Sequence, residues 1–480
     1  MKKINIADDA LRISISTAFF ALLTGCNLAP TYHRPQDVVP ATLTQAPQTQ
    51  RVLLPLAAAQ AQHLQWLQNA SLRQAVALAL QENRDLRMAA DNVDKARAQY
   101  GIARADLLPG INAQLQQQRS RSSADLAGGP SQVSQQITAN VGFASYEVDL
   151  WGRIRNLKAA AWQQFLQVEE NRRGVEIALI AEVANAWLTL AADQERLALA
   201  EQTLQSREQS YALMERMVAL GATSGLALAQ NRSTVAAARG DVALFTAQLA
   251  RSRNALQLLL GGAVPAGLLP EPGILQTQVA LLQPLPQTLP SSILLTRPDV
   301  QAAEHALQAR HADIGAARAA FFPSISLTGN VGTGSTQLDG LFTGPNRSWS
   351  FIPLIKLPIF SAGRLRFGLE AAQADQRLAL AQYEKTVQTA FSEVLDTLAD
   401  RAQWAARLDA QDEAVSSTQT ALTLSQARFD AGADDFLTVL DAQRSLYAAQ
   451  QMQITLRLAE QQNRITLWKV LGGQVLPAAG

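Results

Sequence analysis

The stretch that decides the fold is Arg104-Ala-Asp-Leu-Leu-Pro109, because it returns later as Arg318-Ala-Ala-Phe-Phe-Pro323. The offset is 214 residues (318 minus 104), and further matching residues precede each copy. After each proline come strand-like segments, a Gly-Arg pair, a long helical run, a lone glycine, a second helical run and Leu-Gly-Gly. A repeat this long, with elements in fixed order, predicts two copies of one mixed α and β unit in each chain.

The helical run after each Gly-Arg pair is unusually long. Residues 153–220 and 364–431 lack proline, and a single glycine interrupts each run. A helix of about 68 residues is roughly 100 Å long, which requires a coiled-coil partner. Apolar residues recur every seven positions in the returning run: Leu228, Val235, Val242, Leu249 and Leu256. We therefore predict two coiled-coil hairpins that turn at Gly221 and Gly432.

The segments after the two prolines alternate apolar and polar residues, which is typical of β-strands. They are residues 111–116, 137–143, 324–331 and 348–351. Loops rich in Gly, Ser and Asn separate each pair, so we predict two hairpins and four strands of about ten residues, a length that suits a tilted transmembrane strand. Four strands cannot close a barrel, and an open sheet edge in hydrocarbon leaves backbone groups unpaired. Several chains would therefore have to share one barrel.

The N-terminus is predicted to be an export signal. Two lysines follow Met1, an apolar stretch occupies residues 13–23, and Thr24 and Gly25 are small residues before Cys26. This arrangement resembles the bacterial lipoprotein box, which implies that Cys26 is acylated and becomes the mature N-terminus. Residue 27 is asparagine, and not the aspartate that the resemblance associates with inner-membrane retention. We therefore expect a lipid-anchored protein of the outer membrane.

Aromatic residues cluster at or near the predicted strands: Phe143, Tyr146, Trp151, Trp349, Phe351 and Phe360. They fit either an aromatic belt at the lipid boundary or ordinary packing within a sheet. The expected lipid anchor favours the belt.

The composition excludes several function classes. Lys and Arg number 41 against 40 Asp and Glu, without the basic stripe of a nucleic-acid binder. The four histidines are scattered, and no nucleophile elbow, metal motif or phosphate loop is present. Met214 and Met217 near a hairpin turn are better explained as packing than as a copper site. We predict no enzyme and no cofactor other than the lipid on Cys26.

The chain resembles the outer membrane factors of tripartite efflux and secretion systems, the TolC-like family, in its OprM/NodT lipoprotein branch. The residues that carry the resemblance are 26–35 (CNLAPTYHRP), 83–87 (NRDLR), 104–109, 146–155 (YEVDLWGRIR), 297–300 (RPDV), 318–323, 357–364 (LPIFSAGR), 428–432 (RFDAG) and 440–446 (LDAQRSL). The resemblance implies an α+β membrane protein, a homotrimer with one twelve-stranded outer-membrane β-barrel continuous with a long helical coiled-coil tunnel. It also implies a periplasmic adaptor and an inner-membrane pump of the resistance-nodulation-division type as partners.

The resemblance places a gate near the second hairpin turn. Asp441 matches an aspartate that lines the constricted entrance, where three copies around one axis would repel, raise one another's pKa and attract cations. Phe429 stands at the position of a gate tyrosine, and Thr438 at that of a second pore aspartate. Asp434 and Ala227 replace the two residues of an interchain salt bridge, so closure is expected to depend on hydrophobic packing and Asp441.

The resemblance also makes the two turns the adaptor contacts. The residues are Val218, Leu220, Gly221, Phe429, Ala431 and Gly432. A glycine in the left-handed region that ends each helix accounts for the same motifs without any partner, and both explanations can hold together.

The expected organisation is a signal peptide (1–25), a lipidated N-terminal segment and belt (26–83), a first repeat (84–262), a proline-rich connector (263–296), a second repeat (297–473) and a C-terminal tail (474–480). The expected function is a gated outer-membrane duct that exports drugs or other small toxic compounds. Two alternatives stay open: a lipid-anchored periplasmic coiled-coil scaffold without a pore, and the outer duct of a protein secretion system.

Overall fold

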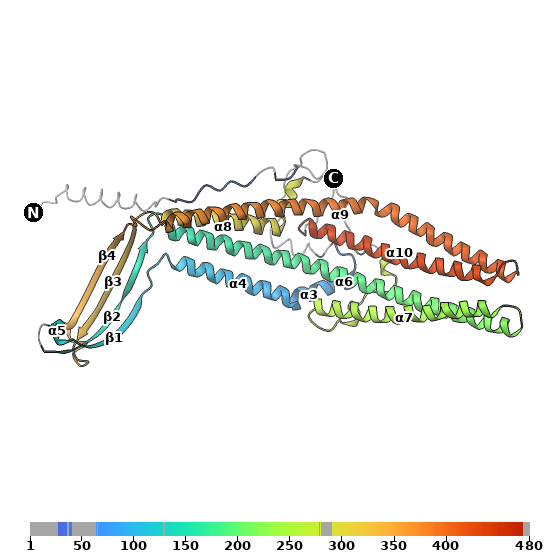
Figure 1. Cartoon of the computed structure of the whole chain (residues 1–480), viewed down its shortest axis with the longest axis horizontal. Coiled ribbons are helices and arrows are strands. Elements are labelled where there is room, and N and C mark those ends of the chain that lie inside the picture. The colour runs from blue at the N-terminus through green and yellow to red at the C-terminus, as the bar shows by residue number, and fades with distance from the viewer. Residues whose placement is uncertain are drawn as a thin grey trace, which may run out of the picture. The chain divides into compact units, whose positions relative to one another are not determined.

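The computed structural model describes residues 27–35, 38–40, 64, 66–127, 130–277, 279 and 290–473 (Figure 1). The chain forms two compact units. The first comprises Met1–Pro35, Asn92–Glu169 and Ala302–Tyr383, and the second comprises Gln36–Asp91, Glu170–Gln301 and Glu384–Gly480. Each unit takes segments from both repeats, so the compact units do not coincide with the repeats predicted as domains.

The main helices occur as equivalent pairs. Helices α4 (Arg84–Ala105) and α8 (Pro298–Ala319) have 22 residues each, α6 (Arg153–Ala219) and α9 (Arg364–Asp430) have 67 each, and α7 (Gly225–Leu259) and α10 (Phe436–Val470) have 35 each. The bounds of α9 and α10 are those of α6 and α7 shifted by 211 residues (364 minus 153, 436 minus 225). The predicted duplication and helix lengths are confirmed.

The remaining helical elements are short. Helix α3 (Ala70–Glu82) lies within the expected N-terminal belt, and α5 (Ala124–Ala127) lies between two strands. Three turns of 3₁₀ helix, Ala266–Leu268, Ile274–Gln276 and Ser291–Thr296, are the only helical elements in the described part of the connector. A fourth, Gly344–Asn346, precedes the last strand. The irregular connector predicted from its prolines is confirmed where the structure describes it.

The four strands are β1 (Asn112–Arg121), β2 (Val133–Val148), β3 (Ser324–Ser335) and β4 (Arg347–Lys356), and they form one antiparallel sheet in the order β1-β2-β3-β4 (Figure 1). Their number is as predicted, but their bounds are wider. β2 has 16 residues, and β1 extends to Arg121, inside a segment predicted as a loop. The ladder bonds join backbone groups of any sequence, so polar residues 117–121 continue the strand by pairing with residues 133–137.

The second unit has the larger hydrophobic core. Residues of α6 such as Ile180, Trp187 and Leu188 are almost fully buried there. The Trp187 indole donates a hydrogen bond to the Leu268 carbonyl at 2.8 Å, which fixes the connector on the core. Helix α6 has the length and hydropathy of a membrane span, but 56% of that apolar stretch is buried inside the protein. Core packing therefore explains its hydropathy.

In the first unit, helices meet through small side chains. Ala160 of α6 packs with Ala309 and Ala312 of α8. A Cβ atom on Gly315 would lie 2.6 Å from the Asn156 side-chain nitrogen, so glycine permits this close approach. The abundance of alanine thus produces slender, closely spaced helices.

Candidate gate and membrane sheet

Both hairpins turn through the same backbone structure. Gly221 and Gly432 adopt φ values of 72° and 70°, the left-handed region that glycine enters without steric cost. The N–H of Ala222 donates to the Met217 carbonyl and that of Gly221 to the Val218 carbonyl, at 2.8 and 2.9 Å, and equivalent bonds surround Gly432. This is a Schellman motif, which satisfies the last carbonyls of each long helix. The predicted turns are confirmed.

Each returning helix begins at a capping side chain. The Ser224 hydroxyl accepts a hydrogen bond from the Ala227 N–H at 3.2 Å, and the Asp435 carboxylate accepts one from the Thr438 N–H at 3.3 Å. The Thr438 hydroxyl also donates to Asp435 at 3.3 Å. Thr438 therefore belongs to the cap of α10, in addition to its predicted place at the gate.

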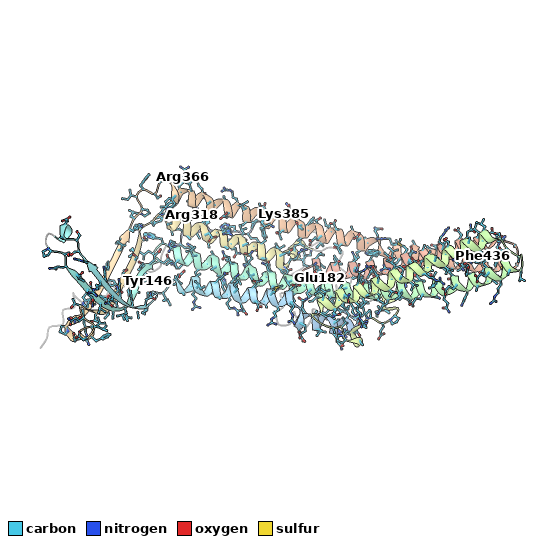
Figure 2. All side chains as sticks on the ribbon, turned by 60° about the horizontal axis from the view of Figure 1, so that its bottom comes forward. Tyr146, Glu182, Arg318, Arg366, Lys385 and Phe436 are labelled. Atoms are coloured by element: carbon cyan, nitrogen blue, oxygen red, sulfur yellow. The ribbon has the colours of Figure 1, made fainter. Side chains whose placement is uncertain are left out.

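One hydrophobic cluster joins the two turn-proximal ends of the hairpins. Its buried members are Met214, Phe436, Val439 and Leu440, and Met217, Leu228, Leu422 and Phe429 pack against them. Phe436 is labelled close to the turn in Figure 2. The Phe429 ring meets the Phe436 ring edge-on at 5.1 Å. Phe429 thus acts through packing, and Met214 is a core residue, as its sequence context predicted.

Asp434 is held by an arginine of its own chain. Arg428 donates to both carboxylate oxygens at 2.6 and 2.8 Å, across the turn from the last turn of α9. These hydrogen bonds lower the pKa of Asp434 and raise that of Arg428. Asp435 caps α10, whereas Asp434 closes the turn as an intrachain ion pair with Arg428, a partner that was not predicted.

Asp441 also has an arginine partner. Arg444, one turn further along α10, donates to its carboxylate, and the two side chains are 75% and 62% exposed respectively. The spacing of three residues is one at which oppositely charged side chains meet on a helix, and this signal was available in the sequence. Asp441 is therefore an exposed carboxylate near the turn that is already paired within its own chain.

The predicted adaptor contacts lie at the surface of the turns. Leu220 is 83% exposed, and Gly221, Ala431 and Gly432 are exposed as well. Val218 is half-buried. The exposed Leu220 therefore gives the hairpin of α6 and α7 an apolar tip.

In the middle rows of the sheet, one face is apolar and the other is polar. The register places Ala113, Val141, Val331 and Trp349 in one row across all four strands. Val141, Val331 and Trp349 are 53%, 69% and 78% exposed in the single chain. The neighbouring row, on the opposite face, contains Gln114, Asn140, Gly332 and Ser348. Apolar side chains exposed on one face and polar ones on the other are typical of a transmembrane strand between lipid and an aqueous lumen.

Five of the six aromatic residues predicted near the sheet fall into two groups, and the sixth, Phe143, is half-buried. Trp349, Phe351 and Phe360 are exposed, as an aromatic belt requires. Tyr146 and Trp151 instead hydrogen-bond to backbone: the Tyr146 hydroxyl donates to the Leu107 carbonyl at 3.1 Å and the Trp151 indole to the Pro323 carbonyl at 2.8 Å. These two residues therefore join segments of the first unit.

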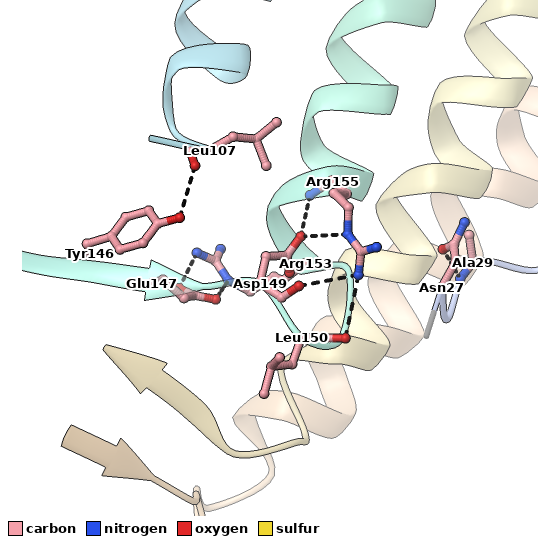
Figure 3. Close-up of polar contacts among 9 residues, drawn as sticks. All are labelled: Asn27, Ala29, Leu107, Tyr146, Glu147, Asp149, Leu150, Arg153 and Arg155. Atoms are coloured by element: carbon pink, nitrogen blue, oxygen red, sulfur yellow. Dashed lines mark hydrogen bonds and ion pairs between the residues drawn. The ribbon is translucent and has the colours of Figure 1, made fainter. Parts of the chain in front are cut away.

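The junction between β2 and α6 contains two arginine–carboxylate pairs (Figure 3). Arg153 donates to both oxygens of Glu147 at 2.8 and 2.7 Å, and this raises the pKa of Arg153. Asp149 accepts bonds from the Arg155 N–H and side chain at 2.8 and 3.2 Å. The YEVDLWGRIR motif thus fixes how the chain passes from strand to helix.

The predicted signal peptide and lipidation site cannot be compared with the structure. Cys26 and residues 1–25 lie outside the described residues. Among the residues that are described, no group of three or more His, Cys, Asp and Glu side chains could hold a metal ion.

Comparison with known proteins decides the family. A model described as outer membrane efflux protein matches residues 75–262 and 289–473. The chain belongs to the outer membrane efflux protein family. The two matched segments correspond to the two halves of the internal repeat.

Proteins of similar sequence align with almost the whole chain. The probable efflux pump outer membrane protein TtgC of Pseudomonas putida is 42% identical over 461 residues, 95% of this chain and 94% of the relative. The outer membrane protein OprJ of Pseudomonas aeruginosa is 42% identical over 465 residues, 96% of this chain and 95% of the relative. A crystal structure of CusC, 37% identical, matches with a TM-score of 0.84 over 94% of this chain and 100% of that chain.

The open state of the MtrE outer membrane channel of Neisseria gonorrhoeae matches with a TM-score of 0.81 at 35% identity, over 93% of this chain and 98% of that one. This outer membrane efflux protein is therefore an efflux channel of the α+β tunnel fold. The family is a transport duct and carries out no enzymatic reaction. The predicted fold class, localisation and absence of enzymatic activity are confirmed at this level.

Proposed function

We propose that the chain is the outer-membrane duct of a tripartite efflux system and works as a homotrimer. The observation that carries the proposal is the open, two-faced sheet. Among the described residues, β1 and β4 each have one edge without a partner strand, and each unpaired backbone group in hydrocarbon costs several kcal/mol. Three copies supply twelve strands (three times four), which close a barrel with Trp349 towards lipid and Gln114 towards the lumen.

The periplasmic entrance is formed by the hairpin turns in this proposal. Asp441, Phe429, Thr438 and Asp434 line or support the gate. Near a threefold axis, three Asp441–Arg444 pairs would give a ring of alternating charge, and the repulsion between the carboxylates would be partly offset by the arginines. Closure then depends on packing of the turn cluster around Phe436 and on this ring.

The partners follow from the exposed turns and from the relatives. An adaptor binds the apolar tip around Leu220 and Gly221 and the equivalent turn at Gly432, and a resistance-nodulation-division pump supplies the substrate. Relatives are named for the efflux of antibiotics, toluene and solvents. We infer that this chain exports small, largely apolar toxic compounds. A lipid on Cys26 anchors the chain in the outer membrane.

Single-channel recording in planar bilayers tests the duct and its gate together. Wild-type protein should give small, cation-selective currents. Asp441→Ala removes the carboxylate ring, so its currents should be larger and less selective for cations. Thr418→Ala, on α9 and away from the turn, serves as the matched control and should conduct like wild type. Silent membranes with correctly folded protein would contradict the duct, and an unchanged Asp441→Ala current would contradict only the gate.

A pore-free periplasmic scaffold accounts for the coiled coils but leaves the exposed apolar row on the sheet unexplained. A secretion duct would share the barrel and the tunnel. Relatives such as TtgC are named for efflux, and we therefore propose efflux.

A further inference from the structure

The residues that follow Cys26 form an extended segment, residues 27–35, which we name the strap. It contains neither helix nor strand, and it lies along α8 within the first unit. The Leu28 carbonyl accepts a hydrogen bond from Arg318 at 3.2 Å. The Tyr32 ring meets the His311 ring edge-on at 5.4 Å. The strap therefore runs antiparallel to α8, with its first residues at the helix end that precedes β3.

The strap ends on a buried carboxylate. Glu304 is 6% exposed, and its Oε1 accepts hydrogen bonds from the Tyr32 hydroxyl at 3.0 Å and from the Arg34 Nε at 2.8 Å. Arg34 Nη2 lies 2.7 Å from the other oxygen, which completes a bidentate pair. Burial and the adjacent Glu304 carboxylate raise the pKa of Tyr32, so the phenol stays protonated and donates. A buried carboxylate without these donors would be an uncompensated charge.

The contacts occur in matching order and at matching distances. From Leu28 to Arg34 is six residues, about 20 Å in an extended chain. From Arg318 to Glu304 is fourteen residues of helix, about 21 Å at 1.5 Å per residue. Next to the Leu28 contact, the Ala29 methyl group lies 2.8 Å from where a Cβ on Gly315 would stand, so only glycine admits the strap at this point. The register of the strap on α8 is thus fixed at both ends.

We propose that Glu304 is a positioning residue that docks the strap on α8 and so delivers the preceding residue to the membrane-proximal end of that helix. Cys26 is bonded directly to Asn27, and β3 begins at Ser324, five residues after α8 ends. An acyl chain on Cys26 then enters lipid at the base of the sheet, at a depth set by the protein. The position of the acyl chain rests on the lipidation proposed above, whereas the docking does not.

A spin label on the exposed residue 33, introduced as His33→Cys in the full-length trimer, reports the docking. Cys26 is the only natural cysteine, and it is removed as Cys26→Ser for labelling. The wild-type strap should give an immobilised spectrum. Glu304→Ala, and Arg34→Gln on the strap itself, should each convert most of the signal to a mobile component, and Glu304→Gln should fall between. Asp313→Asn, which breaks an Arg310 pair on the same helix, should leave the label immobilised.

A label that is already mobile in the Cys26→Ser background would show that the lipid alone holds the segment and would overturn the proposal. An immobilised label in both Glu304→Ala and Arg34→Gln would overturn it as well. Bilayer currents recorded on the same samples separate the two proposals, because Glu304→Ala should conduct like wild type. Absence of current from the sample with the unaltered strap, with its label immobile there and mobile in Glu304→Ala, would count against the duct and leave the docking intact.

Discussion

At the scale of single residues, two carboxylates near the Gly432 turn are each paired with an arginine of the same chain. Arg428 holds Asp434, and Arg444 holds Asp441. All four side chains stand on the last turns of α9 or the first turns of α10, or between them. Exposed pairs of this kind contribute little to stability. They can nevertheless fix side-chain direction, and we expect that to be their role at the entrance.

The Asp434 pair predicts a pH response. Arg428 lowers the pKa of Asp434 below its ordinary value of 3.8, so the contribution of the pair is complete above that pH and is lost as pH falls through the lowered pKa. A spin label at Ala433→Cys should become more mobile as pH falls below about 3.8. Asp434→Asn should be mobile at all pH values. Asp430→Asn, a neighbouring carboxylate bonded to Gln426, should keep the wild-type response, and a pH-independent wild type would contradict the assignment.

Residue types near the turn were partly predictable. Gly221 and Gly432 follow from the need for positive φ at the end of a helix, and Phe429 was correctly expected to pack. The Arg428–Asp434 pair crosses a turn, and its partners are six residues apart, so no helical spacing rule points to it. Tyr32 and Glu304 are separated by 272 residues. Only the folded chain brings such groups together.

At the scale of elements, the two hairpins are joined by a polar seam beyond the hydrophobic cluster. The Tyr447 hydroxyl on α10 donates to Asp241 on α7 at 3.1 Å. The Arg207 guanidinium on α6 lies 5.4 Å from the centre of the Tyr447 ring and donates to the Thr234 carbonyl at 3.0 Å. Burial raises the pKa of Tyr447 to about 12, so the phenol remains a donor. The seam connects helices of both repeats.

Tyr447→Phe tests the seam. It removes one hydroxyl and leaves the Asp241 carboxylate without its donor, so the free energy of unfolding should fall by about 1.5 kcal/mol. Glu208→Gln is the matched control, because its bond to Arg239 joins α6 and α7 within one hairpin and both side chains are exposed. Its effect should stay below about 0.5 kcal/mol. Urea unfolding measures both, and equal effects would contradict a special role for the seam.

Helices were more predictable than strands. The heptad residues Val235 and Leu256 are buried as their spacing requires, and the Gly-Arg pairs and turn glycines marked the ends of α6 and α9. Strand limits were missed because residues 117–121 and 133–136 lack alternation and are held by ladder bonds alone. β2 also shifts register between Phe143 and Tyr146, and such an irregularity adds a residue without a sequence period to reveal it.

At the scale of the whole molecule, the sheet has two edges without a partner strand among the described residues, and the most exposed aromatic residues lie on or next to that sheet. If β1 of one copy pairs with β4 of the next in lipid, the open edges gain partner strands and the exposed aromatic residues contact lipid. The number of strands was predicted from the sequence and is confirmed, and the need for several chains in one barrel was predicted from the sequence and stays a prediction. The number of copies does not follow from the sequence, because nothing local to one chain determines where a ring closes.

Native mass spectrometry of the protein in lipid nanodiscs tests whether three chains share one barrel. We expect a single assembly of three chains, together with channel currents from the same preparation, and no folded monomer in lipid. A stable, folded monomer in the bilayer, or a closed assembly of another number of chains, would contradict the shared twelve-stranded barrel.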